Sequence, residues 1–165
     1  MVELRNKARV KMLVTDVDGV MTEGGMYFGP NGQAMKRFDV KDGYGLKMLQ
    51  AAGVAVAWIT ADESAITRAR SEALQLDMMH EGCSDKAEAL QALAAQAGCD
   101  ADEIVYVGDD LNDLPVVGLV GTFIAPADAA RQVREQAQTV TEANGGRGAV
   151  REVCEAIIEH NEKLG

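Results

Sequence analysis

Four short apolar runs along the chain have the length and composition of buried β-strands. Each run ends at a polar residue, a glycine or a proline, which indicates that the chain turns there. Runs that are apolar at consecutive positions are typical of strands covered on both faces of a parallel sheet. The predicted strands span residues 10–15, 54–59, 104–107 and 120–125.

Segments with helical periodicity lie between and after these runs, at 46–52, 64–74, 84–97 and 150–164. Strands that alternate with helices predict an α/β fold with a doubly wound, Rossmann-like parallel sheet. No internal repeat or linker interrupts the pattern, and 165 residues suffice for one core. We therefore expect a single domain over residues 1–165.

Residues 24–40 break the alternation of strands and helices. Asn31 and Gly32 lie between apolar positions, and an Asn-Gly pair in that setting signals a tight β-hairpin. We expect a hairpin inserted after the first strand. Its apolar residues either fold back on the chain's own core or form a surface for assembly; they are Met26, Tyr27, Phe28, Met35 and Phe38.

Composition and charge narrow the class of protein. Apolar residues make up 47% and charged residues 25%, which excludes a disordered chain. The net charge of −10 repels a phosphate backbone, so nucleic acid is an unexpected partner. The three cysteines and two histidines lack the spacing of disulfide or zinc sites. No apolar stretch is long enough to cross a membrane or to form a signal segment, so we expect a cytoplasmic protein.

Polar residues follow three of the predicted strands: Asp16 and Thr60 come directly after theirs, and Asp109 comes after Gly108. Ligands of open α/β sheets bind where the carboxyl ends of the strands meet. In Asp16-Val17-Asp18-Gly19 two carboxylates stand two residues apart, so extended geometry can direct both into one pocket. This arrangement suits hydrolysis of a phosphate monoester, with Asp16 as the nucleophile and Asp18 as the proton carrier.

Two carboxylates that face a phosphate dianion need a hard cation between them, and Mg²⁺ with oxygen ligands meets this need. Asp109 is expected to complete the metal site. Asp110 and Asp113 are expected to orient the metal ligands through hydrogen bonds, without contacting the metal themselves. Lys86, near a helix start, and the Thr60 hydroxyl are expected to bind the phosphate. Each residue alone has an ordinary structural explanation, such as helix capping, and only their combination and order indicate catalysis.

The combination resembles the haloacid dehalogenase-like phosphatases, through Asp-Val-Asp-Gly-Val at 16–20, Thr60, Lys86 and the acidic segment 109–113. Two further motifs, at 42–45 and 145–152, are similar to those of 3-deoxy-D-manno-octulosonate 8-phosphate phosphatases. The resemblance covers nearly the whole chain. It implies release of phosphate from a sugar acid used in lipopolysaccharide assembly.

The resemblance also implies roles for individual residues. Asp16, the backbone carbonyl of Asp18 and Asp109 would bind Mg²⁺, and Thr60 and Lys86 would hold the phosphate. Ala61, Asp62, Arg70 and, from the C-terminal tail, Arg147 would line the sugar site. The intervals between the motifs are too short for a cap domain, so neighbouring subunits of a homotetramer would enclose the substrate.

One motif departs from the family pattern, because Thr60-Ala61-Asp62 replaces the usual Thr-Gly-Arg. Related phosphatases that act on nonulosonate 9-phosphates carry an acidic residue there, so Asp62 favours that substrate. They also carry a lysine where this chain has Ala73, and segment 42–45 and Arg147 favour the octulosonate. A receiver domain of two-component signalling has similar residue types, but its acidic pair and lone phosphoacceptor occur in a different order.

Overall fold

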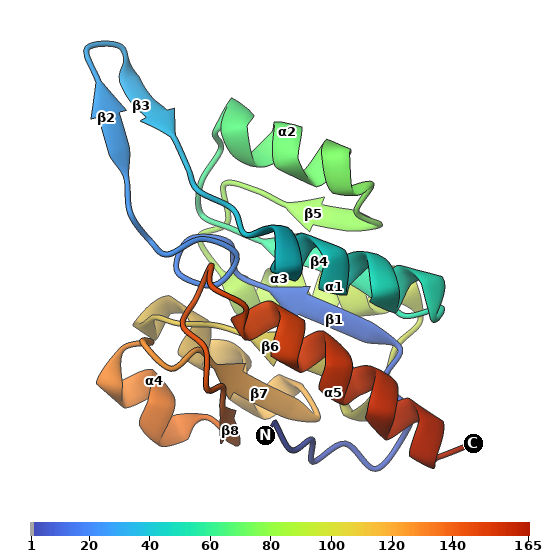
Figure 1. Ribbon diagram of the computed structural model, residues 1–165. Helices are drawn as coiled ribbons and strands as arrows, with labels where there is room; N and C mark the ends of the chain where they lie inside the picture. The colour runs from blue at the N-terminus through green and yellow to red at the C-terminus, as the bar shows by residue number, and fades with distance from the viewer. Residues whose placement is uncertain (1) are drawn as a thin grey trace.

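The computed structural model describes residues 2–165, which form a six-stranded parallel sheet with helices on both faces (Figure 1). The strand order is β5-β4-β1-β6-β7-β8, so β1 lies in the middle with β4 and β6 as its neighbours. This is the predicted doubly wound arrangement. The strands are β1 (Met12–Thr15), β4 (Ala55–Ile59), β5 (Met78–His80), β6 (Ile104–Val107), β7 (Thr122–Ala125) and β8 (Thr139–Val140).

Alternate residues of each strand point to opposite faces, so the sheet separates two apolar cores. On one face, Leu13 and Trp58 pack with buried side chains of α1 and α5. On the other face, Met12 and Tyr106 pack with α3, η2 and α4. The helices are α1 (Val40–Ala51), α2 (Ala65–Leu74), α3 (Lys86–Ala97), α4 (Arg131–Gln136) and α5 (Ala149–Lys163), with 3-10 segments η1 (Ala101–Glu103) and η2 (Leu111–Leu119).

The predicted hairpin is present as β2 (Tyr27–Gly29) and β3 (Gly32–Met35), a separate two-stranded antiparallel sheet. It projects beyond the body of the molecule (Figure 1). Both alternatives for the apolar residues of this segment are found, each for a different part of it. Phe38 stacks on Trp58 with ring centroids 6.1 Å apart, within the core. The other four side chains are exposed; they are Met26, Tyr27, Phe28 and Met35.

The helix predicted at 150–164 is confirmed as α5 (Ala149–Lys163). Helix α5 supplies Val150, Val153 and Ile157 to the core beside α1. The turn before it is also tightly packed, because a side chain on Gly145 would collide with the backbone oxygen of Gly19. The C-terminal quarter of the chain is therefore part of the central fold. None of the helices within residues 2–165 is long and apolar enough to cross a membrane.

Candidate active site at the carboxyl end of the sheet

The fold brings four predicted residues to one edge of the sheet. Asp16 directly follows β1, Thr60 follows β4, and Asp109 lies two residues beyond β6. The backbone N–H of Asp16 donates to the carbonyl of Val107 at 2.9 Å, which aligns the ends of the two strands. Lys86 is the first residue of α3.

Lys86 is a buried cation at this edge of the sheet. Its side chain is 2% exposed, and Nζ lies 2.8 Å from Oδ2 of Asp16 and 2.7 Å from Oδ1 of Asp113. Asp85 caps α3 by accepting from the backbone N–H groups of Ala87 and Glu88, which fixes where the helix begins. Burial opposes the charge of Lys86, but the two carboxylates outweigh this effect and raise its pKa. Lys86 therefore stays protonated beside Asp16.

Asp113 organises the site through both of its carboxylate oxygens. Oδ1 accepts from Lys86 and from the Tyr106 hydroxyl, each at 2.7 Å. Oδ2 accepts from the backbone N–H groups of Asp109 and Asp110, at 3.0 and 3.2 Å. This completely buried side chain thus fixes the loop that carries Asp109. The sequence did not indicate Tyr106, because a tyrosine inside an apolar strand has the appearance of an ordinary core residue.

Asp109 approaches Asp16 across the turn that follows β1. A side chain on Gly19 would collide with the Asp109 carboxylate, and Gly19 also has a left-handed φ of 94°. Only glycine therefore permits this approach. Oδ1 of Asp109 is buried and has no hydrogen-bond partner within residues 2–165.

The carboxylates of Asp16, Asp109 and Asp113 each offer an oxygen within 4.8 Å of the others. Burial and the neighbouring carboxylates raise the pKa of Asp109 to about 8. Burial and Asp113 raise that of Asp16 to about 6, against the opposing effect of Lys86. A divalent cation would relieve this repulsion and would give the unpartnered Asp109 oxygen a ligand. The residues therefore fit Mg²⁺. Each Asp113 oxygen already accepts two hydrogen bonds, whereas each Asp16 oxygen has one partner and Oδ1 of Asp109 has none within residues 2–165, so Asp16 and Asp109 are the available side-chain ligands.

The Asp18 carboxylate does not join the cluster of Asp16, Asp109 and Asp113. Its Oδ2 accepts instead from Lys36 Nζ at 2.8 Å, and its side chain is 37% exposed. The sequence did not indicate Lys36, because a single lysine at the end of a hairpin carries no motif. Its neighbour Arg37 is also charged, and Ala34 and Met35 are exposed, so no local pattern marks Lys36 as buried.

Asp62, which was predicted to contact the sugar, accepts hydrogen bonds from side chains of the protein. Its Oδ2 accepts from Lys36 at 2.8 Å, from the Ser64 hydroxyl at 2.6 Å and from the Thr67 hydroxyl at 2.8 Å. Burial acts to raise the pKa of Asp62, but these hydrogen bonds prevail and lower it. Asp62 is therefore a charged anchor at the start of α2.

The remaining predicted residues take different positions. The Thr60 hydroxyl accepts from the Asp62 backbone N–H at 3.1 Å, and Ala61 between them is exposed. Asp110 is an exposed cap of η2, with its carboxylate on the Leu111 backbone N–H at 2.8 Å.

Two arginines predicted to reach the sugar have partners in the protein. The Arg70 guanidinium lies over the Phe38 ring, 5.6 Å from its centroid, and its buried Nε has no hydrogen-bond partner within residues 2–165. Arg147 is largely exposed and lies 3.4 Å from the carboxylate of Glu23. Neither arginine contacts the carboxylate cluster directly.

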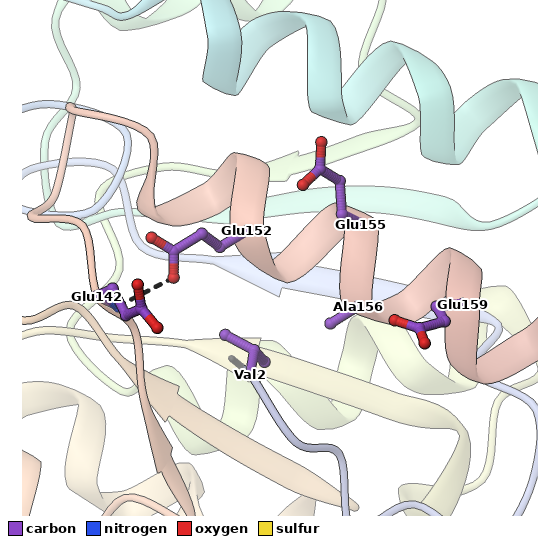
Figure 2. Close-up of a pocket in the computed structure, with 6 residues that line it drawn as sticks. All are labelled: Val2, Glu142, Glu152, Glu155, Ala156 and Glu159. Atoms are coloured by element: carbon purple, nitrogen blue, oxygen red, sulfur yellow. Dashed lines mark hydrogen bonds between the residues drawn. The ribbon is translucent and has the colours of Figure 1, made fainter.

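A separate cavity of about 350 Å³ lies along α5 (Figure 2). Its four glutamates would repel a phosphate dianion, and one of them, Glu152, accepts from the backbone N–H groups of residues 142 and 143. The cavity is therefore unsuited to a phosphate ester. It is lined by Val2, Glu142, Glu152, Glu155, Ala156 and Glu159.

Comparison with known proteins agrees with this geometry. The model of the haloacid dehalogenase-like hydrolase family matches residues 58–153. The 3-deoxy-D-manno-octulosonate 8-phosphate phosphatase KdsC of Yersinia pestis is 40% identical over 161 residues, which cover 98% of this chain and 86% of that protein. These matches favour the phosphatase interpretation over the receiver domain.

Solved structures of similar proteins share the fold. The cobalt-bound octulosonate 8-phosphate phosphatase of Haemophilus influenzae has a TM-score of 0.91 and 39% identity, covering 94% of this chain and 91% of that one. The enzyme of Moraxella catarrhalis, in complex with magnesium, phosphate and the sugar acid, has a TM-score of 0.89 and 35% identity, covering 94% and 90%. Both structures hold a divalent metal, as the acidic cluster of this chain would.

Proposed function

Because this chain belongs to the haloacid dehalogenase-like hydrolases and, within them, to the 3-deoxy-D-manno-octulosonate 8-phosphate phosphatases, we propose that it hydrolyses this sugar-acid phosphate. The products are the sugar acid, for lipopolysaccharide assembly, and inorganic phosphate. The observation that carries the proposal is the position of Asp16, between the ammonium group of Lys86 and the carboxylate of Asp109.

Asp16 is the nucleophile in this proposal. Its Oδ1 accepts from the Val17 backbone N–H at 2.6 Å and its Oδ2 faces Lys86, so the carboxylate has a fixed orientation toward a phosphoryl group. Attack on phosphorus forms an aspartyl phosphate and releases the sugar alcohol. Asp18 protonates the leaving oxygen and then accepts a proton from the water that hydrolyses the intermediate.

Asp16 and Asp109, with the backbone carbonyl of Asp18, are the proposed ligands of Mg²⁺. When bound, the ion offsets the negative charge of the phosphoryl oxygens. Lys86 contributes a second positive charge, and Asp113 holds Lys86 and the Asp109 loop in place. Thr60 contributes phosphate contacts from the end of β4.

The sugar is selected, in this proposal, by the loop that begins at Ala61 and by Arg70 and Arg147. The alternative substrate, a nonulosonate 9-phosphate, was favoured only by the acidic character of Asp62. Asp62 accepts hydrogen bonds from Lys36, Ser64 and Thr67, which accounts for a carboxylate at this position without any sugar contact. This engagement supports the octulosonate.

We further propose that the protein is a cytoplasmic homotetramer. The hairpin residues Met26, Phe28 and Met35 are 62%, 68% and 59% exposed, and such a projecting apolar surface favours burial against another subunit. A neighbouring subunit would also enclose an active site that has no cap domain of its own.

A substrate panel tests the proposed function. We expect kcat/KM for octulosonate 8-phosphate to exceed that for nonulosonate 9-phosphates by at least about tenfold, since each 1.4 kcal/mol of transition-state binding changes the ratio tenfold. A generic aryl phosphate serves as the reference for the chemical step. A preference for a nonulosonate 9-phosphate would contradict the proposal and would identify that compound as the substrate.

A further inference from the structure

Lys36 is a buried cation on a segment that otherwise belongs to the exposed hairpin. It directly follows β3, yet its side chain is 1% exposed. The bridge between Thr22 and Phe38 closes the base of the hairpin and turns the chain back toward the sheet. This turn brings a lysine from the hairpin to the carboxylate of Asp18.

All three protons of the Lys36 ammonium group have acceptors. Nζ lies 2.8 Å from Oδ2 of Asp18, 2.8 Å from Oδ2 of Asp62 and 3.1 Å from Oγ1 of Thr67. A lysine ammonium has three donors and no acceptor, so no donor remains for a phosphate or a sugar. Lys36 therefore acts on other side chains and not on the substrate.

Two further contacts hold the anchor of this lysine in place. The Thr67 hydroxyl donates to Oδ2 of Asp62 at 2.8 Å while it accepts from Lys36. The Ser64 hydroxyl donates to the same oxygen at 2.6 Å. Removing an ammonium group from water is costly, and this closed set of hydrogen bonds compensates for the loss of hydration. The arrangement gives Lys36 one position.

The Asp18 carboxylate receives one hydrogen bond, on Oδ2, from any side chain or backbone group within residues 2–165. Its Oδ1 is left without a protein partner, on a side chain that is 37% exposed. Lys36 therefore occupies Oδ2, and Oδ1 is the oxygen left to contact a leaving group or a water.

We propose that Lys36 is a positioning residue that orients Asp18, and that Asp62 and Thr67 orient Lys36 in turn. The inference rests on the proposed function, since it assumes that Asp18 transfers protons. In the first step Oδ1 of Asp18 gives its proton to the leaving alkoxide oxygen as the ester P–O bond breaks and the Asp16–phosphorus bond forms. In the second step Oδ1 takes a proton from water as the water oxygen bonds to phosphorus and the Asp16–phosphorus bond breaks. Lys36 keeps its protons throughout.

The contact with Lys36 explains why a carboxylate occupies position 62, where the family has arginine. The carboxylate of Asp62 provides the second negative charge beside Lys36, at the same 2.8 Å as Asp18. Without it, the lysine would be paired with Asp18 alone and held less firmly. Residue 62 is therefore expected to affect proton transfer through Lys36, without contacting the sugar.

The test compares two phosphate esters on the Mg²⁺-loaded enzyme with Lys36→Met. A simple alkyl phosphate needs protonation of its leaving group, whereas 4-nitrophenolate leaves without it. We expect kcat for the alkyl ester to fall about a hundredfold, in line with the contribution of general acid catalysis. Release of the first nitrophenolate should change less than about threefold, followed by slow turnover, because the water step still depends on Asp18. Stopped-flow absorbance would record this as a burst of nitrophenolate.

Lys41→Met is the matched control, because Lys41 is an exposed lysine of α1 and its substitution removes the same charge. Asp62→Asn is the second variant, which retains Lys36 and keeps the shape of its anchor should Lys36→Met fail to fold. It should give the same leaving-group dependence with a smaller loss. Equal losses on both esters without a burst, or no loss in a folded variant, would overturn the inference. Since both esters are synthetic, the outcome is independent of which sugar acid is the substrate.

Discussion

Asp16 owes its orientation to contacts that come from strand β6, helix α3 and the 3-10 segment η2. Lys86 begins α3, Tyr106 lies in β6, and both contact Asp113, which holds the backbone of Asp109. The carboxylates of Asp16 and Asp109 are thereby kept close in spite of their repulsion, which raises the pKa of both. At the scale of residues, the site is a set of buried charges that the fold forces together.

Asp16→Asn is expected to lower kcat on a phosphate monoester by at least about a thousandfold, because an amide oxygen is a poor nucleophile toward phosphorus. Asp100→Asn serves as a control, since Asp100 is an exposed residue next to η1, before β6 begins. Steady-state assays with Mg²⁺ and thermal melts of both variants provide the comparison. Activity of Asp16→Asn within tenfold of the parent would refute the nucleophile assignment.

The raised pKa values of Asp16 and Asp109 predict how the thermal stability of the protein depends on pH and on Mg²⁺. Asp109 has a pKa of about 8 and Asp16 of about 6 in the fold, against 3.8 ordinarily. The folded chain therefore binds more protons than the unfolded chain between about pH 4 and about pH 8, and stability falls as pH rises through this window. We expect Mg²⁺ to raise Tm more at about pH 8 than at about pH 6, because it binds the deprotonated carboxylates.

Asp109→Asn is the control for this effect. The variant lacks the carboxyl with the higher pKa, so both the decline of Tm with pH in the absence of metal and the gain from Mg²⁺ should become smaller. Scanning calorimetry with chelator and with Mg²⁺ measures both quantities. An identical gain from Mg²⁺ in parent and variant would show that Asp109 is not a metal ligand.

At the scale of elements, the contact between α1 and α5 explains a motif that was attributed to the substrate. Asp42 in the first turn of α1 is buried and accepts from the backbone N–H groups of Gly148 and Arg151, at 3.2 and 2.9 Å. It therefore caps α5 from a neighbouring helix, and burial raises its pKa. The motifs at 42–45 and 145–152 are two sides of one structural contact.

Asp42→Ala is expected to lower the free energy of unfolding by about 1 to 2 kcal/mol, the usual effect of losing a helix cap. Asp39→Ala is the matched control, because Asp39 is a partly buried cap of α1 itself with a single backbone bond to Lys41. Its loss should be the smaller of the two. Urea unfolding followed by circular dichroism gives both values, and equal stability of Asp42→Ala and the parent would contradict the capping role.

At the scale of the whole molecule, the hairpin has two separate tasks. Its tip exposes Met26 and Phe28 to solvent, while the strand that leaves it carries Lys36 to Asp18 and Phe38 to Trp58. The hairpin of one chain thus links a surface suited to assembly with the predicted proton carrier. The exposed side chains of Met26 and Phe28, at 62% and 68%, support the proposed assembly because burial against another subunit would remove them from water.

Phe28→Asp is expected to convert the proposed tetramer to smaller species, since a charge at the centre of an apolar contact loses its hydration. Light scattering after size-exclusion chromatography measures the mass. Leu164→Asp introduces the same charge at an exposed apolar residue near the C-terminus and should leave the mass unchanged. A parent protein that is monomeric at all concentrations would refute the tetramer.

Much of the fold could be predicted because it depends on local patterns. Strand β6 matches the predicted 104–107, and α2 begins one residue after its cap Ser64, as periodicity and capping indicate. The prediction of a helix at 46–52 was too short, because Gly43 and Gly45 weaken the helical signal that Asp39 restores as a cap. Strands β5 and β8 were missed, since two or three residues become a strand only through pairing with β4 or β7.

The sequence by itself determined four of the six strands of the main sheet, four of the helices, the turn after β1 and the placing of Asp16, Thr60 and Asp109 near strand ends. These features follow from periodicity and from bonds between residues close in the chain. Only the tertiary structure decided that Lys36 lies between Asp18 and Asp62 and that Tyr106 holds Asp113. Those contacts join segments that are distant in sequence, and a buried charge is located by the partners that surround it and not by its neighbours along the chain.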